Sequence, residues 1–270
     1  MSVYRKEWKL AKDMAVATGD ILRRGLKSKR RVTYKGKVDL VTQVDVQAEK
    51  FITSQIKKAY PGHSILAEES GESIKQSPFL WIIDPIDGTT NYAHGYPAFC
   101  ISIALAVDGK MTLGAIYDPV HDELFYAHRG QGAFLNRKRI SVSTEKKLLH
   151  SLLATGFPYD IAESRIDNLE NFGRMYKHSR GIRRGGSAAL DLCYLACGRF
   201  DGFWELKLHP WDTAAGLVIV EEAGGKVTQI DGSEYSIYNN TILASNGRIH
   251  DQMSDILLLD KSCPVCHKNL

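Results

Sequence analysis

The chain has 270 residues, of which 44% are hydrophobic and 24% are charged, and its formal net charge is +4. This length suits one large domain or two closely packed halves, and the composition is that of an ordinary globular protein. The small net charge argues against nucleic-acid binding, and no apolar run approaches the length of a transmembrane helix.

Two features lead us to expect a cytoplasmic protein. The first 13 residues carry six charged side chains and no apolar core, unlike a signal peptide. The five cysteines are an odd number, and without a secretion signal they are expected to be reduced thiols.

The N-terminal part predicts a helix followed by a basic loop. Residues 4–24 place their apolar side chains on one stripe of an amphipathic helix, and Gly25 is interpreted as its stop. The basic and polar residues 27–39 are expected to form a loop.

A second helix is expected after Asp45. Thr42 and Asp45 have the spacing of a helix N-cap and an acidic third residue, so capping is the simplest interpretation of both. Pro61 and Gly62 would end this helix.

The stretch from Phe79 to Pro97 passes abruptly from apolar to polar residues. Five apolar residues, 79–83, predict a strand buried on both faces, and Pro85, which lacks an N–H, is interpreted as its exit. Asp84 and Asp87 would then lie at the carboxyl end of the strand, where α/β sheets place their ligands. The alternative is a simple turn, since Asp, Pro and Gly all favour turns.

Two neighbouring segments add polar groups to the same end. A short strand over residues 64–67 runs into Glu68, with Glu69 interpreted as structural. Gly88, Thr89 and Thr90 follow Asp87, and their N–H and hydroxyl groups suit a phosphate.

The remaining chain predicts antiparallel strands and then an alternation of strands and helices. Turn pairs separate strands over 101–107, 111–117 and 123–127, and the polar residues 136–147 are interpreted as a seam between two halves. Later strands are expected over 152–155, 200–205, 226–230 and 241–244, and helices over 166–176, 188–196, 213–223 and up to about 259.

Five carboxylates fall at the ends of these elements and predict a metal site. All are oxygen donors without a His–Cys cluster, which suits Mg²⁺ or Mn²⁺ rather than zinc or copper. Several carboxylates stay ionised in one pocket only if cations compensate them, so a site for several metals is expected. Two such ions can activate water and stabilise a leaving oxygen, as phosphoryl transfer requires. The five are Asp45, Glu68, Asp84, Asp87 and Asp212.

Several motifs closely resemble those of the inositol monophosphatase family over residues 5–258. They are AEES at 67–70, WIIDPIDGTTNYAHGYP at 81–97, RRGGSAALDLCYLACGRFDGFWE at 183–205 and PWDTAAGLVIVEEAGG at 210–225. The resemblance implies an α+β fold, a layered αβαβα sandwich, that is usually a homodimer. We therefore expect one catalytic domain over 1–260, with halves 1–145 and 146–260, and a flexible tail over 261–270.

The resemblance also implies roles for individual residues. Glu68, Asp84 and the carbonyl of Ile86 would bind a first metal ion. Asp84, Asp87 and Asp212 would bind a second, and a third, weaker ion would share Glu68. Catalysis would involve Asp45, Thr89 and Glu68. The substrate would contact Asp87, Gly88, Thr89, Thr90, Arg184, Gly186, Ser187, Ala188, Glu205 and Asp212.

The expected activity is Mg²⁺-dependent hydrolysis of a small sugar or cyclitol phosphate, with myo-inositol 1-phosphate as the leading substrate and inhibition by lithium. Fructose-1,6-bisphosphatase activity is the nearest alternative, and 3′-phosphoadenosine 5′-phosphate is a less favoured substrate. A regulatory protein that binds RNA polymerase or ribosomal RNA factors is the alternative of another class.

Three questions stay open from the sequence. Lys35 and Lys37 are equal candidates for a loop lysine of the site, and Arg183 and Arg184 for a substrate contact. The Cys-x-x-Cys-His pattern at residues 263–267 is expected to belong to a disordered tail, with half of a shared zinc site as the alternative.

Overall fold

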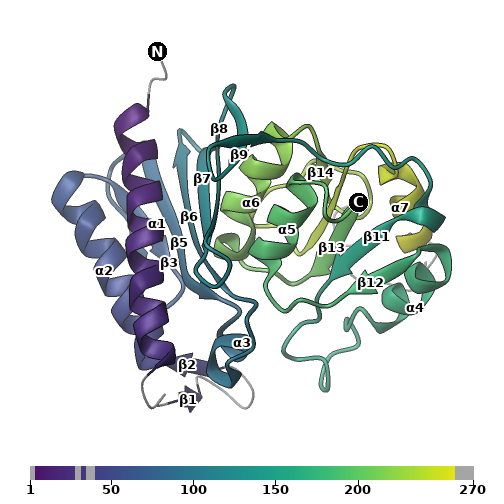
Figure 1. Ribbon diagram of the computed structural model, residues 1–270, viewed down its shortest axis with the longest axis horizontal. Coiled ribbons are helices and arrows are strands. Elements are labelled where there is room, and N and C mark those ends of the chain that lie inside the picture. The colour runs from purple at the N-terminus through teal and green to yellow at the C-terminus, as the bar shows by residue number, and fades with distance from the viewer. Residues whose placement is uncertain (1–3, 28–31, 35–39, 259–270) are drawn as a thin grey trace.

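The computed structural model describes residues 4–27, 32–34 and 40–258, and these form five alternating layers of helices and sheets (Figure 1). Helices α1 (Arg5–Leu26) and α2 (Gln43–Ala59) form the first layer, and α5 (Ala188–Ala196) and α6 (Pro210–Glu222) lie between the two large sheets. Helices α4 (Leu169–His178) and α7 (His250–Leu257) form the last layer. The expected αβαβα sandwich is therefore confirmed.

The larger sheet has eight strands in the order β10-β9-β8-β7-β6-β5-β3-β4, and only the pair β3–β5 is parallel. One face packs on α1 and α2 and the other on α6, so the central strands are buried on both faces. Its strands are β3 (Ser64–Ala67), β4 (Gly71–Ser73), β5 (Phe79–Asp87), β6 (Cys100–Val107), β7 (Lys110–Asp118), β8 (Glu123–His128), β9 (Gly132–Leu135) and β10 (Lys138–Ile140).

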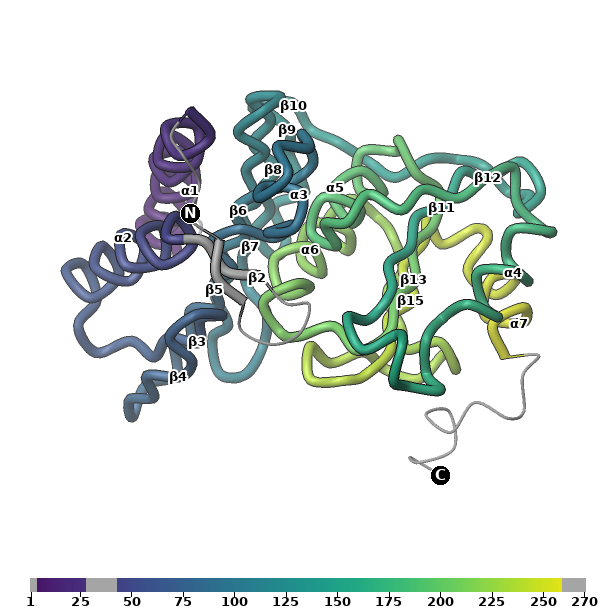
Figure 2. The backbone as a smooth tube through the Cα atoms, turned by 90° about the horizontal axis from the view of Figure 1, so that it is seen from below, coloured from purple at the N-terminus to yellow at the C-terminus, as the bar shows by residue number. Residues whose placement is uncertain are grey.

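The smaller sheet has five strands in the order β12-β11-β13-β15-β14. Figure 2 shows α5 and α6 between this sheet and the larger one, so the central helices face apolar side chains on both sides. Its strands are β11 (Leu152–Thr155), β12 (Gly181–Arg183), β13 (Gly202–Leu206), β14 (Lys226–Thr228) and β15 (Thr241–Ser245).

The interpretation of Gly25 as a helix stop is wrong, because α1 continues to Leu26. A Cβ at Gly25 would lie 2.2 Å from the Tyr92 hydroxyl and 2.8 Å from a methyl carbon of Val44. Tyr92 is fully buried, and its hydroxyl donates a hydrogen bond to the Leu22 carbonyl at 2.9 Å. Glycine is therefore needed here for close packing rather than to end the helix.

The interpretation of Pro85 as the exit of its strand is also wrong. Strand β5 continues to Asp87, and its pairing with β6 shifts between Asp84 and Asp87. Asp84 lies opposite Ser102 and Asp87 opposite Cys100, so β5 contains one extra residue. A bulge accommodates a proline because the disrupted ladder there does not require its N–H.

Other expectations need smaller corrections. The expected loop 27–39 contains β1 (Val32–Tyr34), which pairs antiparallel with β2 (Leu40–Thr42). Strands β4, β9 and β12 were not expected, and β10 lies inside the stretch 136–147 interpreted as a seam. The two halves stay a prediction, while Lys35, Lys37 and the tail lie outside the described residues. Short elements such as α3 (Thr89–His94) and the 3₁₀ turn Leu148–His150 complete the fold, and no described helix is both long and apolar enough to cross a bilayer.

Candidate active site

Two carboxylates of β5 meet a third from a distant part of the chain at the end of that strand. Ligand oxygens of Asp84, Asp87 and Asp212 all lie within 4.8 Å of one another. In a regular strand, two residues three positions apart would point to opposite faces, so Asp84 and Asp87 would diverge. The extra residue of the β5 bulge changes this alternation and allows both carboxylates to serve one site.

Asp212 reaches the site from the first turn of α6. Pro210 begins the helix, where its missing N–H costs nothing, and the His209 N–H donates to Asp212 Oδ2 at 2.7 Å. This carboxylate therefore caps its own helix and also belongs to the cluster.

Glu68 joins the cluster because β3 and β5 run parallel, so their carboxyl ends lie at the same edge of the sheet. The backbone N–H of Glu68 donates to the Ile83 carbonyl at 3.2 Å, and its carboxyl group shares a hydrogen bond with Asp84. The structure thus brings four of the five expected metal-site carboxylates together.

Burial and mutual repulsion dominate the electrostatics of this cluster. Burial, followed by the charges of Glu68, Asp87 and Asp212, raises the pKa of Asp84 well above its usual range. Burial and then the charge of Asp87 likewise raise the pKa of Asp212. A cation would remove this repulsion, so the donor set fits one or more divalent ions bound by oxygen.

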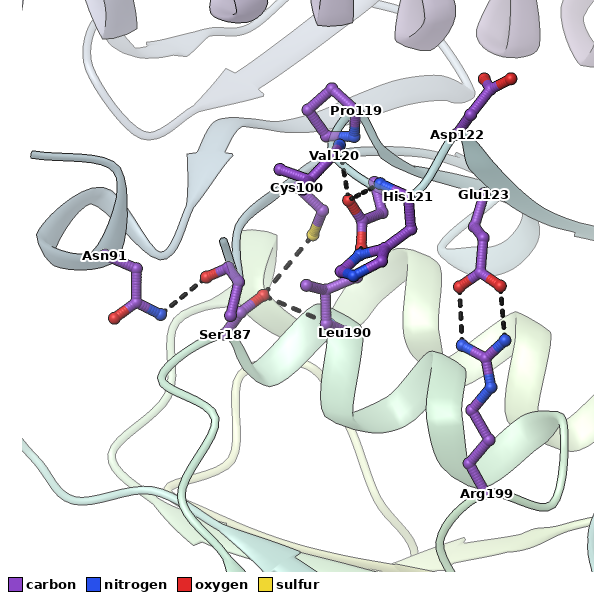
Figure 3. A network of polar contacts seen from close by, with 12 residues as sticks. Asn91, Cys100, Pro119, Val120, His121, Asp122, Glu123, Ser187, Leu190 and Arg199 are labelled. Atoms are coloured by element: carbon purple, nitrogen blue, oxygen red, sulfur yellow. Dashed lines mark hydrogen bonds and ion pairs between the residues drawn. The ribbon is translucent and has the colours of Figure 1, made fainter. Parts of the chain in front are cut away.

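Asp87 is held by the start of α5. Its Oδ2 accepts hydrogen bonds from the Ser187 hydroxyl at 2.6 Å and from the Ala189 N–H at 2.7 Å. Burial raises the pKa of Asp87 to about 6, although these hydrogen bonds act in the opposite direction. Figure 3 shows Ser187 beside Cys100, with an Oγ–Sγ distance of 3.6 Å.

The loop before α5 is tied to the metal-site loop by Asn91. Its side-chain amide donates to the carbonyls of Ala98, at 2.6 Å, and Gly185, at 2.9 Å. Asn91 therefore holds the segment that follows β5 against the segment that precedes α5.

A hydroxyl and a buried carboxylate lie beside the cluster. The Thr89 hydroxyl is 3.1 Å from Asp45 Oδ1 and 2.9 Å from the Ile86 carbonyl oxygen. Asp45 lies in the first turn of α2, as expected for a helix-capping acid, but it is fully buried and faces Thr89. The side chain of Thr42 lies outside the described residues, so the expected N-cap stays a prediction.

Gly88 allows the backbone to turn into this site. Its φ of 96° is in the left-handed region, and a Cβ would lie 2.9 Å from the Ala98 carbonyl oxygen. Thr90 lines neither cavity of the site.

The metal-site cavity has a volume of about 220 Å³ and is lined by the carboxylate cluster. A second cavity of about 80 Å³ adjoins it, and both are lined by Asp87, Tyr159 and Asp212. The second cavity contains the remaining expected substrate contacts, Arg184, Gly186, Ser187, Ala188 and Glu205.

The two arginines differ in their position relative to this second cavity. Arg184 lines it, whereas Arg183 does not, and the Arg183 guanidinium instead donates to the Ile182 carbonyl at 3.3 Å. Five further lining residues were not expected from the sequence: Gly156, Phe157, Tyr159, Asp191 and Leu208. Asp191 lies inside the motif at residues 183–205, but no spacing rule singles it out.

Comparison with known proteins assigns this site to a family. The model of the inositol monophosphatase family matches residues 5–258. A Synechocystis inositol-1-monophosphatase is 48% identical over 230 residues, which are 84% of this chain and 80% of that protein. The solved inositol monophosphatase of Anabaena superposes with a TM-score of 0.86 at 46% identity, covering 94% of this chain and 95% of that one.

A Pseudomonas aeruginosa protein named Nus factor SuhB is 46% identical over 222 residues, covering 80% of this chain and 81% of that protein. The chain is thus a phosphatase in class. It belongs to the inositol monophosphatase family.

Proposed function

We propose that the protein is a Mg²⁺-dependent phosphatase of small polyol phosphate monoesters, with myo-inositol 1-phosphate as its leading substrate. The observation that carries this proposal is a cluster of oxygen ligands, with Asp84 and Asp87 buried, beside the hydrogen-bonded pair of Thr89 and Asp45. Mn²⁺ would be an acceptable substitute, since the donor set contains only oxygen.

The family resemblance suggests which residues would hold each ion. Glu68, Asp84 and the Ile86 carbonyl would hold the first ion, and Asp84, Asp87 and Asp212 the second. A third, weaker ion would share Glu68. When bound, such ions neutralise the phosphate and lower the pKa of a water molecule.

Thr89 and Asp45 would orient the attacking water. The Thr89 hydroxyl donates a hydrogen bond to Asp45, which leaves lone pairs of the Thr89 oxygen free to accept a hydrogen bond from water. The water then directs its own lone pair away from Thr89 and toward the phosphorus. Because Asp45 is fully buried, bulk water does not compete for its carboxylate.

The remaining roles divide between the two cavities. The N–H groups of Gly88 and Thr89 would meet the phosphate, with Thr90 as a further contact. Arg184, Ser187 and Glu205 would face the alcohol part, together with the backbone of Gly186 and Ala188.

The test is an activity assay with and without metal. Chelation by EDTA should abolish hydrolysis and added Mg²⁺ should restore it, whereas full activity in chelator would refute the metal assignment. Values of kcat/KM for inositol 1-phosphate, fructose 1,6-bisphosphate and 3′-phosphoadenosine 5′-phosphate, measured side by side, would decide the substrate. Lithium is expected to inhibit this activity, which the same assay tests. The protein is also expected to be a homodimer, which light scattering on the same preparation tests.

A second candidate function is regulatory, because relatives of 46% and 43% identity are named Nus factor SuhB. Pull-down from cell extract with the wild-type chain and with Asp84→Asn tests this function separately from catalysis. Capture of transcription proteins by both forms would support it, and capture of none by either form would exclude it.

A further inference from the structure

We propose that Asp191, a residue without an assigned role, is a specificity-determining residue that accepts a hydrogen bond from a hydroxyl of the substrate's alcohol part. This inference rests on the proposed function. It assigns to the site a second carboxylate acceptor beside Glu205, and hence a preference for alcohols that carry at least two neighbouring free hydroxyls.

The first observation is that Asp191 is buried without a partner. Its side chain is 3% exposed, it lines the 80 Å³ cavity, and no group among residues 4–27, 32–34 and 40–258 hydrogen-bonds or ion-pairs with its carboxylate. A buried carboxylate without a hydrogen bond is costly to keep, so a partner that arrives from outside is the economical explanation.

The second observation is that glycines make room for two carboxylates in this cavity. A Cβ at Gly185 would lie 2.9 Å from Asp191 Oδ1, and a Cβ at Gly156 would lie 2.0 Å from Glu205 Oε1. Neither glycine has a positive φ, so the space for the carboxylates, rather than backbone strain, explains the absence of a side chain.

The third observation is the charge arrangement. The nearby charge of Asp191, after burial, raises the pKa of Glu205, while the Arg184 guanidinium at the same cavity acts in the opposite direction on both acids. An acceptor pair beside one cation suits a neutral polyol, whose hydroxyls donate to the carboxylates.

A purely structural role in α5 explains Asp191 less well. Acidic residues in a first helical turn are common, because they complement the helix dipole. The free backbone N–H groups at the start of α5, however, already have acceptors. The Ser187 Oγ accepts a hydrogen bond from the Leu190 N–H, and the Asp87 carboxylate accepts one from the Ala189 N–H. A capping acid would also have no reason to be buried in the substrate cavity.

The experiment combines protein variants with substrate analogues. Asp191→Ala removes the acceptor and Asp191→Asn preserves the side-chain volume. Asp251→Ala, which removes the exposed first-turn acid of α7, is the matched control. Each form is assayed with Mg²⁺ on inositol 1-phosphate, on its monodeoxy analogues, and on p-nitrophenyl phosphate, which offers no hydroxyl.

The expected loss in kcat/KM for inositol 1-phosphate is roughly tenfold to a hundredfold for Asp191→Ala, while p-nitrophenyl phosphate changes less than about twofold. One deoxy analogue should be poor for the wild type yet no worse than inositol 1-phosphate for Asp191→Ala, because its missing hydroxyl is the partner of Asp191. Asp191→Asn should lose less, and Asp251→Ala should match the wild type.

Other outcomes separate the two proposals. Equal losses on both substrates would mean that Asp191 acts through Asp87 on the metal site, and an unchanged deoxy series would mean that it does not touch substrate. Either result overturns the inference while leaving the phosphatase intact. Failure of the wild type to hydrolyse any of these esters with Mg²⁺ would overturn the proposed function itself, and this inference with it.

Discussion

Replacement of Glu205 by glutamine tests whether the smaller cavity selects the alcohol. Glu205 and Arg184 line the same cavity, and Glu205 is 8% exposed. Its carboxylate lies over the backbone of Gly156. The substitution keeps the side-chain volume and removes the negative charge, so the change reports on hydrogen bonding rather than on packing.

The expected magnitude follows from this burial. A hydrogen bond to a charged acceptor in such a site contributes about 1.5–3 kcal/mol, which is roughly tenfold to a hundredfold in kcat/KM. Glu205→Gln should impose this loss on inositol 1-phosphate and spare p-nitrophenyl phosphate. Because burial and the charge of Asp191 raise the pKa of Glu205, removing the charge should not lower the melting temperature of the metal-free protein.

Gly156→Ala provides an independent perturbation of the same carboxylate. Its Cβ would lie 2.0 Å from Glu205 Oε1, so the carboxylate must move by more than 1 Å to restore a normal contact. The same selective loss is expected. Equal losses on both substrates, in either variant, would refute the assignment and show that Glu205 supports the metal cluster instead.

Three further predictions concern other parts of the molecule. Asp84→Asn should abolish activity while leaving the apo melting temperature unchanged or higher, since it relieves carboxylate repulsion; a large drop would show a structural role. Gly25→Ala should lower the free energy of unfolding by about 1–3 kcal/mol, because the new methyl group would clash with Tyr92. Gly173→Ala, with no neighbour within 4 Å, should instead stabilise α4 by about 1 kcal/mol. The same change in unfolding free energy for both variants would contradict the packing argument. Burial lowers the pKa of His250 to about 4, so as the pH decreases from 6.5 toward 4 this histidine takes up a proton in the unfolded chain before it does so in the folded one, and the free energy of unfolding should fall. Urea unfolding at pH 7 and 4.5 should show a smaller fall in this free energy for His250→Gln than for the wild type. An equal fall in both would refute the argument.

Local sequence patterns by themselves determined many of the elements. The apolar stripe of α1 and the apolar runs of β5 and β6 follow from periodicity, because burial selects side chains at a spacing set by backbone geometry. The positions of Asp87 at the end of β5 and of Asp212 in the first turn of α6 were also predictable, since the glycine and proline signals beside them are local. The motifs then indicated the family before any contact was known.

The tertiary structure alone decided how these groups meet. The bulge that allows Asp84 and Asp87 to serve one site depends on the register of β5 with β6, which no local rule specifies. Gly25 is required by Tyr92, a residue distant in sequence, and the choice of Arg184 over Arg183 depends on which one lines the cavity. By sequence, Asp191 is an ordinary acidic residue of a first helical turn, and only the tertiary structure shows that it is buried near Glu205. Burial and electrostatic environment arise from packing between distant segments rather than from sequence neighbours.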